Sequence, residues 1–193
     1  RTPDDAISIR DYVSGRQVKQ AVVVGGGFIG LEMAENLKEQ GVSVTVIDAA
    51  AQILPDILDP EMAAYVKRHL AQKGIRVLTN TKAVRIEGEA EVSGIRTDSA
   101  LLSCGLVVMA VGIRPNTAFL QDSGVELDKG KIVVDSMLRT NVADIFAAGD
   151  CAVVTNRLTG KRQWSPMGSS ANLEGRTLAQ ILSGSEKAYP GVL

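Results

Sequence analysis

A strand that runs directly into a glycine-rich turn leaves few folds open to this chain. Residues 20–24 form an apolar, β-branched run of the kind found in parallel strands that are buried on both faces. Residues 25–30 then match the pattern G-x-G-x-x-G, and apolar residues recur at helical spacing over about 28–40. A second apolar strand is predicted over 42–47. The order strand, tight turn, helix and strand predicts a βαβ unit.

The residue types in the turn are those that a bound pyrophosphate requires. Gly25 permits the sharp turn out of the strand, Gly27 lets a phosphate approach the backbone, and Gly30 lets the helix pack close to the sheet. Phosphates would lie at the helix N-terminus, where free N–H groups and the helix dipole favour negative charge. Asp48 follows Gly30 by 18 residues, close to the ~20 residues expected of a ribose-binding carboxylate. The alternative is a structural glycine turn followed by an exposed aspartate.

Asp48 also indicates which dinucleotide is bound. Its carboxylate can accept hydrogen bonds from both ribose hydroxyls of an adenosine, but it would repel a 2′-phosphate. Residues 49–52 contain no arginine or lysine to offset that repulsion. We therefore expect NADH to be preferred over NADPH. The adenosine of FAD would satisfy the same aspartate, so this motif alone does not separate NAD from FAD.

The rest of the chain alternates helices and strands, which indicates an α/β layered fold. Residues 83–88 and 91–97 alternate apolar and polar side chains, as antiparallel hairpin strands do. The other predicted elements are a capped helix over 2–15, a helix over 59–73, strands over 75–78, 106–111, 132–134 and 145–150, and a last helix over 171–183.

The composition and charge of the chain exclude several classes of function. The 193 residues carry a formal net charge of −1, which provides no electrostatic footprint for nucleic acid or for an anionic membrane. The longest apolar runs are too short to cross a bilayer, and no secretory signal opens the chain. Cys104, Cys151 and His69 cannot build a disulfide scaffold or a metal site, and His69 is predicted at the surface. We therefore expect a reduced, soluble, cytoplasmic protein.

Several motifs in order resemble one enzyme family. The stretch from Gly25 to Glu32 looks like the NAD-domain signature of the pyridine nucleotide-disulfide oxidoreductases, and it is most similar to their coenzyme A-disulfide reductase and NADH oxidase branch. The other stretches that agree in order and spacing are 110–116, 140–146, 147–151 and, in the tail, 166–176. The resemblance spans essentially the whole chain.

The resemblance implies a Rossmann-like NAD-binding domain, a parallel sheet with an antiparallel β-meander, inserted into a split FAD domain. Residues 1–18 would be the exit from the first FAD segment, 19–138 the NAD domain, and 139–193 the returning, incomplete FAD segment. A chain that begins with Arg1 and lacks the family's FAD glycine motif, redox cysteine and C-terminal dimerisation domain reads as a piece of a longer parent. That parent is expected to be a homodimer that binds FAD.

The family's roles can be carried over by position. Gly25, Gly27, Phe28, Ile29 and Gly30 would line the path of the pyrophosphate and nicotinamide. Phe28 would be the aromatic gate between nicotinamide and flavin; the alternative is a packed helix residue.

Three further residues acquire roles in the same way. Glu32 would bind the nicotinamide carboxamide, although a glutamate in a first helical turn can simply favour the helix dipole. Gly112 would approach the NAD backbone. Asp150 would hydrogen-bond the ribityl chain of FAD; the alternative is an ordinary turn residue after Gly149.

The implied activity is hydride transfer from NADH to FAD and on to a cysteine redox centre, with a small disulfide, peroxide or oxygen as acceptor. That centre is expected upstream, since Cys104 and Cys151 are predicted to be packing residues, and the chain alone should bind NADH without turnover. The alternatives are an NADH-dependent ferredoxin- or rubredoxin-type reductase and a non-catalytic nucleotide-binding module. The turns at Gly112 and at Gly149-Asp150 argue against a methyltransferase.

Overall fold

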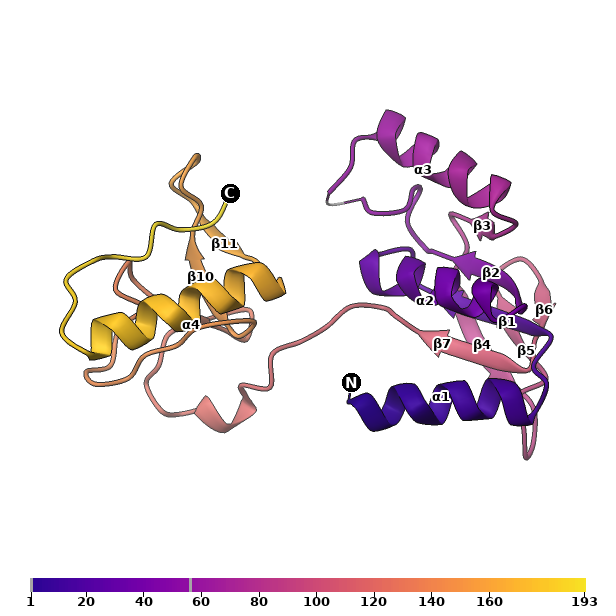
Figure 1. Cartoon of the computed structure of the whole chain (residues 1–193), viewed down its shortest axis with the longest axis horizontal. Coiled ribbons are helices and arrows are strands. Elements are labelled where there is room, and N and C mark those ends of the chain that lie inside the picture. The colour runs from indigo at the N-terminus through magenta and orange to yellow at the C-terminus, as the bar shows by residue number, and fades with distance from the viewer. Residues whose placement is uncertain (1, 56) are drawn as a thin grey trace. The chain divides into compact units, whose positions relative to one another are not determined.

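The structure, a computed structural model, describes residues 2–55 and 57–193 of the chain. These residues fall into two units, Arg1–Gly112 and Ile113–Leu193, each with its own sheet and its own apolar core (Figure 1). Each unit is described by itself below. Within the described ranges, no helix combines the length and the apolar content that crossing a bilayer demands.

The first unit contains helices and two kinds of sheet. Its elements in chain order are α1 (Pro3–Gly15), β1 (Gln20–Val24), α2 (Phe28–Glu39), β2 (Ser43–Ile47), α3 (Pro60–Gln72), β3 (Arg76–Leu78), β4 (Ala83–Glu87), β5 (Gly94–Thr97), β6 (Leu101–Ser103) and β7 (Leu106–Met109).

A parallel sheet with the strand order β3-β2-β1-β7 forms the centre of this unit. The valine run of β1 pairs with β2 on one side and with β7 on the other, both in parallel. Its residues are almost completely excluded from water, since Val23 is 0% exposed. A strand with neighbours on both edges and cover on both faces has no polar side to present, and this explains its continuous apolar sequence.

Alternate residues of β1 face different layers. Ala21 and Val23 pack in one core cluster with Val13 of α1 and Leu37 of α2. Val22 and Val24 belong instead to a cluster that includes Ile95 of β5, from the antiparallel sheet β4-β5-β6. The parallel sheet therefore lies between helices on one face and an antiparallel meander on the other. This is the layered α/β arrangement predicted from the sequence.

The second unit is built on a mixed sheet with the order β11-β10-β9-β8. Strands β9 and β10 are parallel, while the outer pairs are antiparallel. The buried core includes Leu138, which is 0% exposed, and α4 packs against it through Leu178. Its elements are η1 (Ala118–Leu120), β8 (Leu127–Asp128), β9 (Lys131–Val133), β10 (Ala152–Thr155), β11 (Arg162–Trp164) and α4 (Gly168–Leu182).

One predicted strand is wrong. Residues 145–150 form no strand, and only an isolated bridge joins Phe146 to Arg139. Positive φ angles of +62° at Asp144 and +85° at Gly149 bend the chain at both ends of this apolar stretch. The stretch is apolar because Ala147 packs into the core, and the strand that joins the sheet is β10, which follows directly.

The first unit ends at Gly112, within the span 19–138 that the family resemblance assigns to the NAD domain. Strand pairing is the reason, because β9 pairs with β10 and β8 pairs with β9. These pairings place residues 127–133 in the same sheet as the segment that was expected to begin at 139.

Candidate functional site

The carboxyl ends of the parallel strands meet at one edge of the central sheet. Val24 at the end of β1 lies opposite Ile47 of β2 and opposite Met109 of β7. The glycine loop, Asp48 and the segment leading to Gly112 therefore leave the sheet at the same edge. Ligands of open α/β sheets bind outside this edge, at the point where strand order reverses. Here β1 is that point, with β2 on one side and β7 on the other.

Two glycines of the loop are required by the protein itself. Gly25 has a φ of +110°, and a Cβ at this position would overlap the carbonyl oxygen of Ala110. A Cβ on Gly30 would overlap the carbonyl oxygen of Gly25 in the same way. The turn out of β1 and the close approach of α2 to the sheet therefore both depend on the missing side chains.

Gly27 differs from these two glycines. A Cβ built on it meets no atom within 4 Å, and its φ of −81° is open to any residue. Gly27 is also the N-cap of α2, and no side chain caps this helix. The first N–H groups of an α-helix have no partner within the helix. Among the described residues, no side chain bonds the first N–H groups of α2, and these donors lie beside an open space.

Asp48 is bound to the glycine loop. Its Oδ2 accepts a hydrogen bond of 2.6 Å from the Gly26 N–H, and its Oδ1 accepts one of 2.7 Å from the Ala50 N–H. The carboxylate is partly buried, and these two bonds fix its plane. The sequence predicted the position of Asp48 but not its bond to Gly26, since no sequence pattern shows which backbone N–H a side chain reaches.

Phe28, Ile29 and Glu32 lie at the first turns of α2. Phe28 and Ile29 expose 51% and 55% of their surface, although both are large and apolar. Ile29 and Glu32 line a groove of about 490 Å³ between α2 and α1. Gly112, at the end of the first unit, is exposed and has a φ of +101°. Of the predicted residues, the structure brings the loop and Asp48 into direct contact.

Asp150 lies in the second unit, where it follows the positive-φ Gly149. Its side chain is exposed, and its carbonyl oxygen accepts a 2.8 Å hydrogen bond from Nε1 of Trp164. The Gly149 N–H donates to Oε2 of Glu174 at 2.6 Å. Glu174 was not singled out from the sequence. The sequence does contain a signal for the burial of Glu174, because Glu174 shares the helical spacing of Thr177 and Ile181, the other buried residues of α4.

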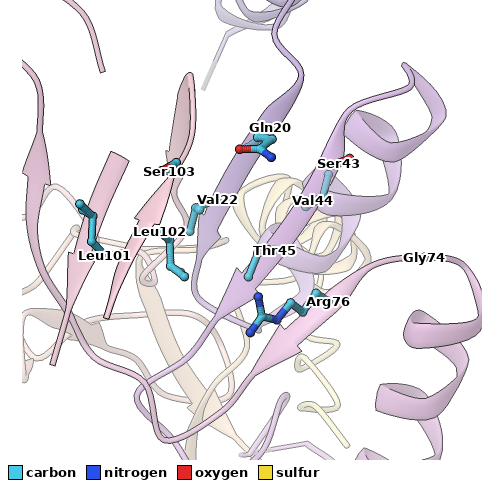
Figure 2. A pocket seen from close by; sticks show the side chains of 11 residues that line it. Gln20, Val22, Ser43, Val44, Thr45, Gly74, Arg76, Leu101, Leu102 and Ser103 are labelled. Atoms are coloured by element: carbon cyan, nitrogen blue, oxygen red, sulfur yellow. The ribbon is translucent and has the colours of Figure 1, made fainter. Parts of the chain in front are cut away.

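A second pocket of the first unit is separate from the glycine loop. Figure 2 shows the side chains that line it, which come mainly from the beginnings of β1, β2 and β3 and from β6. The polar side chains that line it include Gln20, Thr45 and Arg76. Because the strands are parallel, this pocket of about 440 Å³ lies at their amino ends, and the glycine loop leaves from their carboxyl ends.

The remaining residues singled out from the sequence occupy ordinary positions. Cys104 is buried in the core between the two sheets of the first unit, Cys151 is half-buried, and both are free thiols. Burial raises the pKa of both thiols, which disfavours the reactive thiolate. His69 is exposed, as predicted. Within the described residues, no group of three or more potential ligands could hold a metal ion.

Comparison with known proteins gives consistent matches. The family profile "Pyridine nucleotide-disulphide oxidoreductase" matches residues 1–171. An NADH oxidase of Methanocaldococcus jannaschii is 37% identical over 98% of this chain and 43% of its own length. An NAD(P)H coenzyme A polysulfide/persulfide reductase of Pyrococcus horikoshii is 34% identical over 99% of this chain and 43% of its own length. The chain thus spans less than half the length of these curated relatives.

Solved structures agree with these sequence relatives. An FAD-dependent pyridine nucleotide-disulphide oxidoreductase of Desulfovibrio vulgaris is 40% identical, with a TM-score of 0.88 over 98% of this chain and 49% of that chain. An engineered water-forming NADPH oxidase bound to NADPH is 26% identical, with a TM-score of 0.87 over 96% of this chain and 41% of that one. The family profile covers most of the chain, and the fold agrees with that of the solved relatives. The chain belongs to the pyridine nucleotide-disulphide oxidoreductase family.

Proposed function

We propose that this chain is the NADH-binding portion of an FAD-dependent oxidoreductase, with the NADH site in the first unit and part of the FAD site in the second. The observation that carries this proposal is the contact between Asp48 and Gly26. It fixes a carboxylate beside a glycine turn and the uncapped start of α2. This juxtaposition is what a dinucleotide needs, because its ribose seeks hydrogen-bond acceptors and its pyrophosphate seeks N–H donors.

The loop fits a pyrophosphate. The unpaired N–H groups at the start of α2 and the positive end of the helix dipole favour an anion there. The open space beside Gly27 supports the same assignment, since neither a close contact nor a positive φ requires glycine at that position. A phosphate bound close to the backbone would explain why position 27 is a glycine. We assign Gly25, Gly27 and Gly30, with Phe28 and Ile29 beside them, to this part of the site.

The surroundings of Asp48 support NADH over NADPH. Its carboxylate would repel a 2′-phosphate, and residues 49–55 contain no arginine or lysine. The engineered NADPH oxidase is a mutant in which an aspartate is changed to alanine and the alanine after it to arginine. This chain has Asp48-Ala49 in the same order. The same number of residues separates Gly30 from Asp48 as separates the mutated glycine of that enzyme from its mutated aspartate.

The remaining proposed cofactor contacts involve the nicotinamide and the flavin. Glu32 and Gly112 would contact the nicotinamide half of NADH, and Phe28 would lie between nicotinamide and flavin. Asp150, exposed at the turn after Gly149, would hydrogen-bond the ribityl chain of FAD. When bound, NADH would supply a hydride and FAD would accept it. We expect the cysteine redox centre that would receive the electron pair to lie outside this chain. The chain's own residues bind and orient the cofactors.

The relatives support a small acceptor for the whole enzyme. Their names include NADH oxidase and coenzyme A polysulfide/persulfide reductase, which fits a small disulfide, peroxide or oxygen. We further propose that the whole enzyme is a cytoplasmic homodimer and that this chain alone does not turn over.

Calorimetric titration of the purified chain with NADH and with NADPH tests the NADH site. We expect tighter binding of NADH, and Asp48→Ala should weaken it about 10- to 100-fold, the cost of losing hydrogen bonds to a charged group. Glu39→Ala, which removes an exposed carboxylate from the other end of α2, is the matched control and should bind as the wild type does. The double variant Asp48→Ala/Ala49→Arg should prefer NADPH. Equal binding of NADH by the wild type and by Asp48→Ala would refute the ribose role.

A further inference from the structure

Glu174 is a carboxylate buried in the second unit without a cation. It is 2% exposed and lies in α4. No lysine or arginine of the described chain forms an ion pair with it. A buried carboxylate in such a place costs free energy unless it is neutral or well hydrogen-bonded. Its presence on the buried side of a helix therefore calls for a function that an apolar residue could not perform.

The hydrogen bonds of Glu174 reach one particular turn. Its Oε2 accepts the Gly149 N–H at 2.6 Å. The side chain of Tyr189, which is 6% exposed, interacts with the same carboxyl group. Gly149 has a φ of +85°, a conformation that places its N–H and the following Asp150 on a tight turn. The Ala152 N–H donates to the Gly149 carbonyl oxygen at 2.9 Å and closes that turn.

We propose that Glu174, supported by Tyr189, is the positioning residue that fixes the Gly149-Asp150 turn for its ligand. The proposal rests on the proposed function in one respect, namely that Asp150 contacts FAD. Glu174 itself is buried and does not reach the exposed side of the turn. It acts on the ligand only through the backbone of Gly149.

The charges around Glu174 make this positioning dependent on pH. The groups that face it are Tyr189, the carboxylate of Asp150 and the thiol of Cys151. Burial raises the pKa of Glu174 above its usual range, and the charge of Asp150 acts in the same direction. A carboxyl whose pKa is raised by folding stabilises the fold at low pH, and this stabilisation is lost as the pH rises through the raised pKa.

Amide NMR of the chain tests the role of Glu174 without any flavin. In the wild type, the Gly149 amide should exchange slowly, and its chemical shift should move with a midpoint above the usual range of a glutamate. Glu174→Gln keeps an acceptor of the same shape, so slow exchange should persist while the pH-dependent shift disappears. Glu174→Ala should exchange about tenfold faster at Gly149, because the acceptor is lost. Glu186→Gln, at an exposed site of the same unit, should behave as the wild type.

Each outcome bears on the proposal. A pH-dependent shift that persists in Glu174→Gln would overturn it, as would unchanged exchange at Gly149 in Glu174→Ala. If Glu174→Ala fails to fold, the conservative glutamine variant still decides. In the full-length flavoprotein, Glu174→Ala should retain FAD about tenfold more weakly than Glu174→Gln. Equal retention would refute the link to flavin, whereas a wild type that binds no FAD would refute the proposed function and leave the amide result standing.

Discussion

Both carboxylate oxygens of Asp48 accept a hydrogen bond from the protein, and the carboxylate can still accept hydrogen bonds from a ligand. Each oxygen accepts one backbone N–H, from Gly26 and from Ala50. An ionised carboxylate offers about four lone-pair sites, so two remain after these bonds. In the proposed complex the ribose hydroxyls add to the bonds that Asp48 already makes. The carboxylate is thereby held in place before the ligand arrives, which lowers the entropic cost of binding.

Gly25 and Gly30 are needed by the fold, whereas Gly27 is, in our proposal, needed by the ligand. Gly27→Ala should destabilise the first unit by only about 0.5–1 kcal/mol, because the new methyl group enters open space and the loss is that of a glycine N-cap. The same variant should lose most of its affinity for NADH. Gly30→Ala should destabilise the first unit by about 1–3 kcal/mol, because its methyl group overlaps the Gly25 carbonyl oxygen.

Urea unfolding and calorimetric titration of the two glycine variants provide the measurements. A Gly27→Ala protein that binds NADH as tightly as the wild type would contradict the assignment of Gly27 to the phosphate. A Gly30→Ala protein of wild-type stability would contradict the close packing described for α2.

The hydroxyl of Tyr189 has a raised pKa, and this can be observed directly. Burial, together with the adjacent Glu174, raises the pKa of Tyr189 to about 12. Its neutral form therefore stabilises the folded second unit up to the ordinary pKa of about 10, and this contribution is lost as the pH rises from there towards 12. The absorbance titration of the wild type minus that of Tyr189→Phe should show a midpoint near 12. A midpoint near the ordinary value would contradict the buried contact with Glu174.

At the scale of elements, helix α3 illustrates how local sequence decides where a helix begins. Asp59 is its N-cap, accepts a hydrogen bond of 3.0 Å from the Met62 N–H, and is followed by Pro60 at the first helical position. Asp59→Ala should therefore destabilise the first unit by about 1 kcal/mol. Glu61→Ala, an exposed change in the same turn, is the control in thermal or urea unfolding. Equal stability of both variants would show that the cap contributes nothing.

The sequence predicted those elements whose signals are local. The helices α1, α2 and α3 and the strands β1 and β2 were predicted within a residue or two, because caps, glycine stops and apolar period all lie in the chain itself. The false strand over 145–150 arose because an apolar run packs into a core in the same way whether it is extended or bent. Short strands such as β6 and β8 were missed, because two or three residues are too few to show an alternating pattern.

The site residues show the same difference between local signals, which can be predicted, and long-range contacts, which cannot. The motif predicted the positions of Gly25, Gly30 and Asp48, and the structure shows why glycine is needed at the first two. The contact of Asp48 with Gly26 and that of Glu174 with Gly149 could not be predicted, because each joins residues more than 20 positions apart. Only the three-dimensional fold brings such partners together.

At the scale of the whole molecule, the apolar clusters of the two units share no residue among those that the structure describes. The clusters around β1 belong to the first unit, and the cluster around Leu138 belongs to the second. All proposed NADH contacts from Gly25 to Gly112 lie in the first unit. Asp150 and the Glu174–Gly149 contact lie in the second.

This division predicts that residues 1–112 suffice for NADH binding. A protein of these residues should fold, since it contains complete cores on both faces of its central sheet. Its affinity for NADH should lie within about threefold of that of the whole chain, a change of less than ~0.7 kcal/mol. Circular dichroism and calorimetry provide the measurement, with residues 113–193 as the control that should not bind. A folded 1–112 protein with no affinity would place essential contacts beyond Gly112.

The contact between Asp48 and Gly26 constrains how coenzyme choice can change during evolution. One carboxylate anchors the loop and, in our proposal, selects the coenzyme, so a mutation there alters both properties at once. A lineage that moves towards a phosphate-bearing coenzyme through Asp48 alone passes through an intermediate with a loosened turn. The route that avoids this intermediate begins with a change elsewhere that stabilises the turn. The order in which mutations arise then decides whether the new preference is reached.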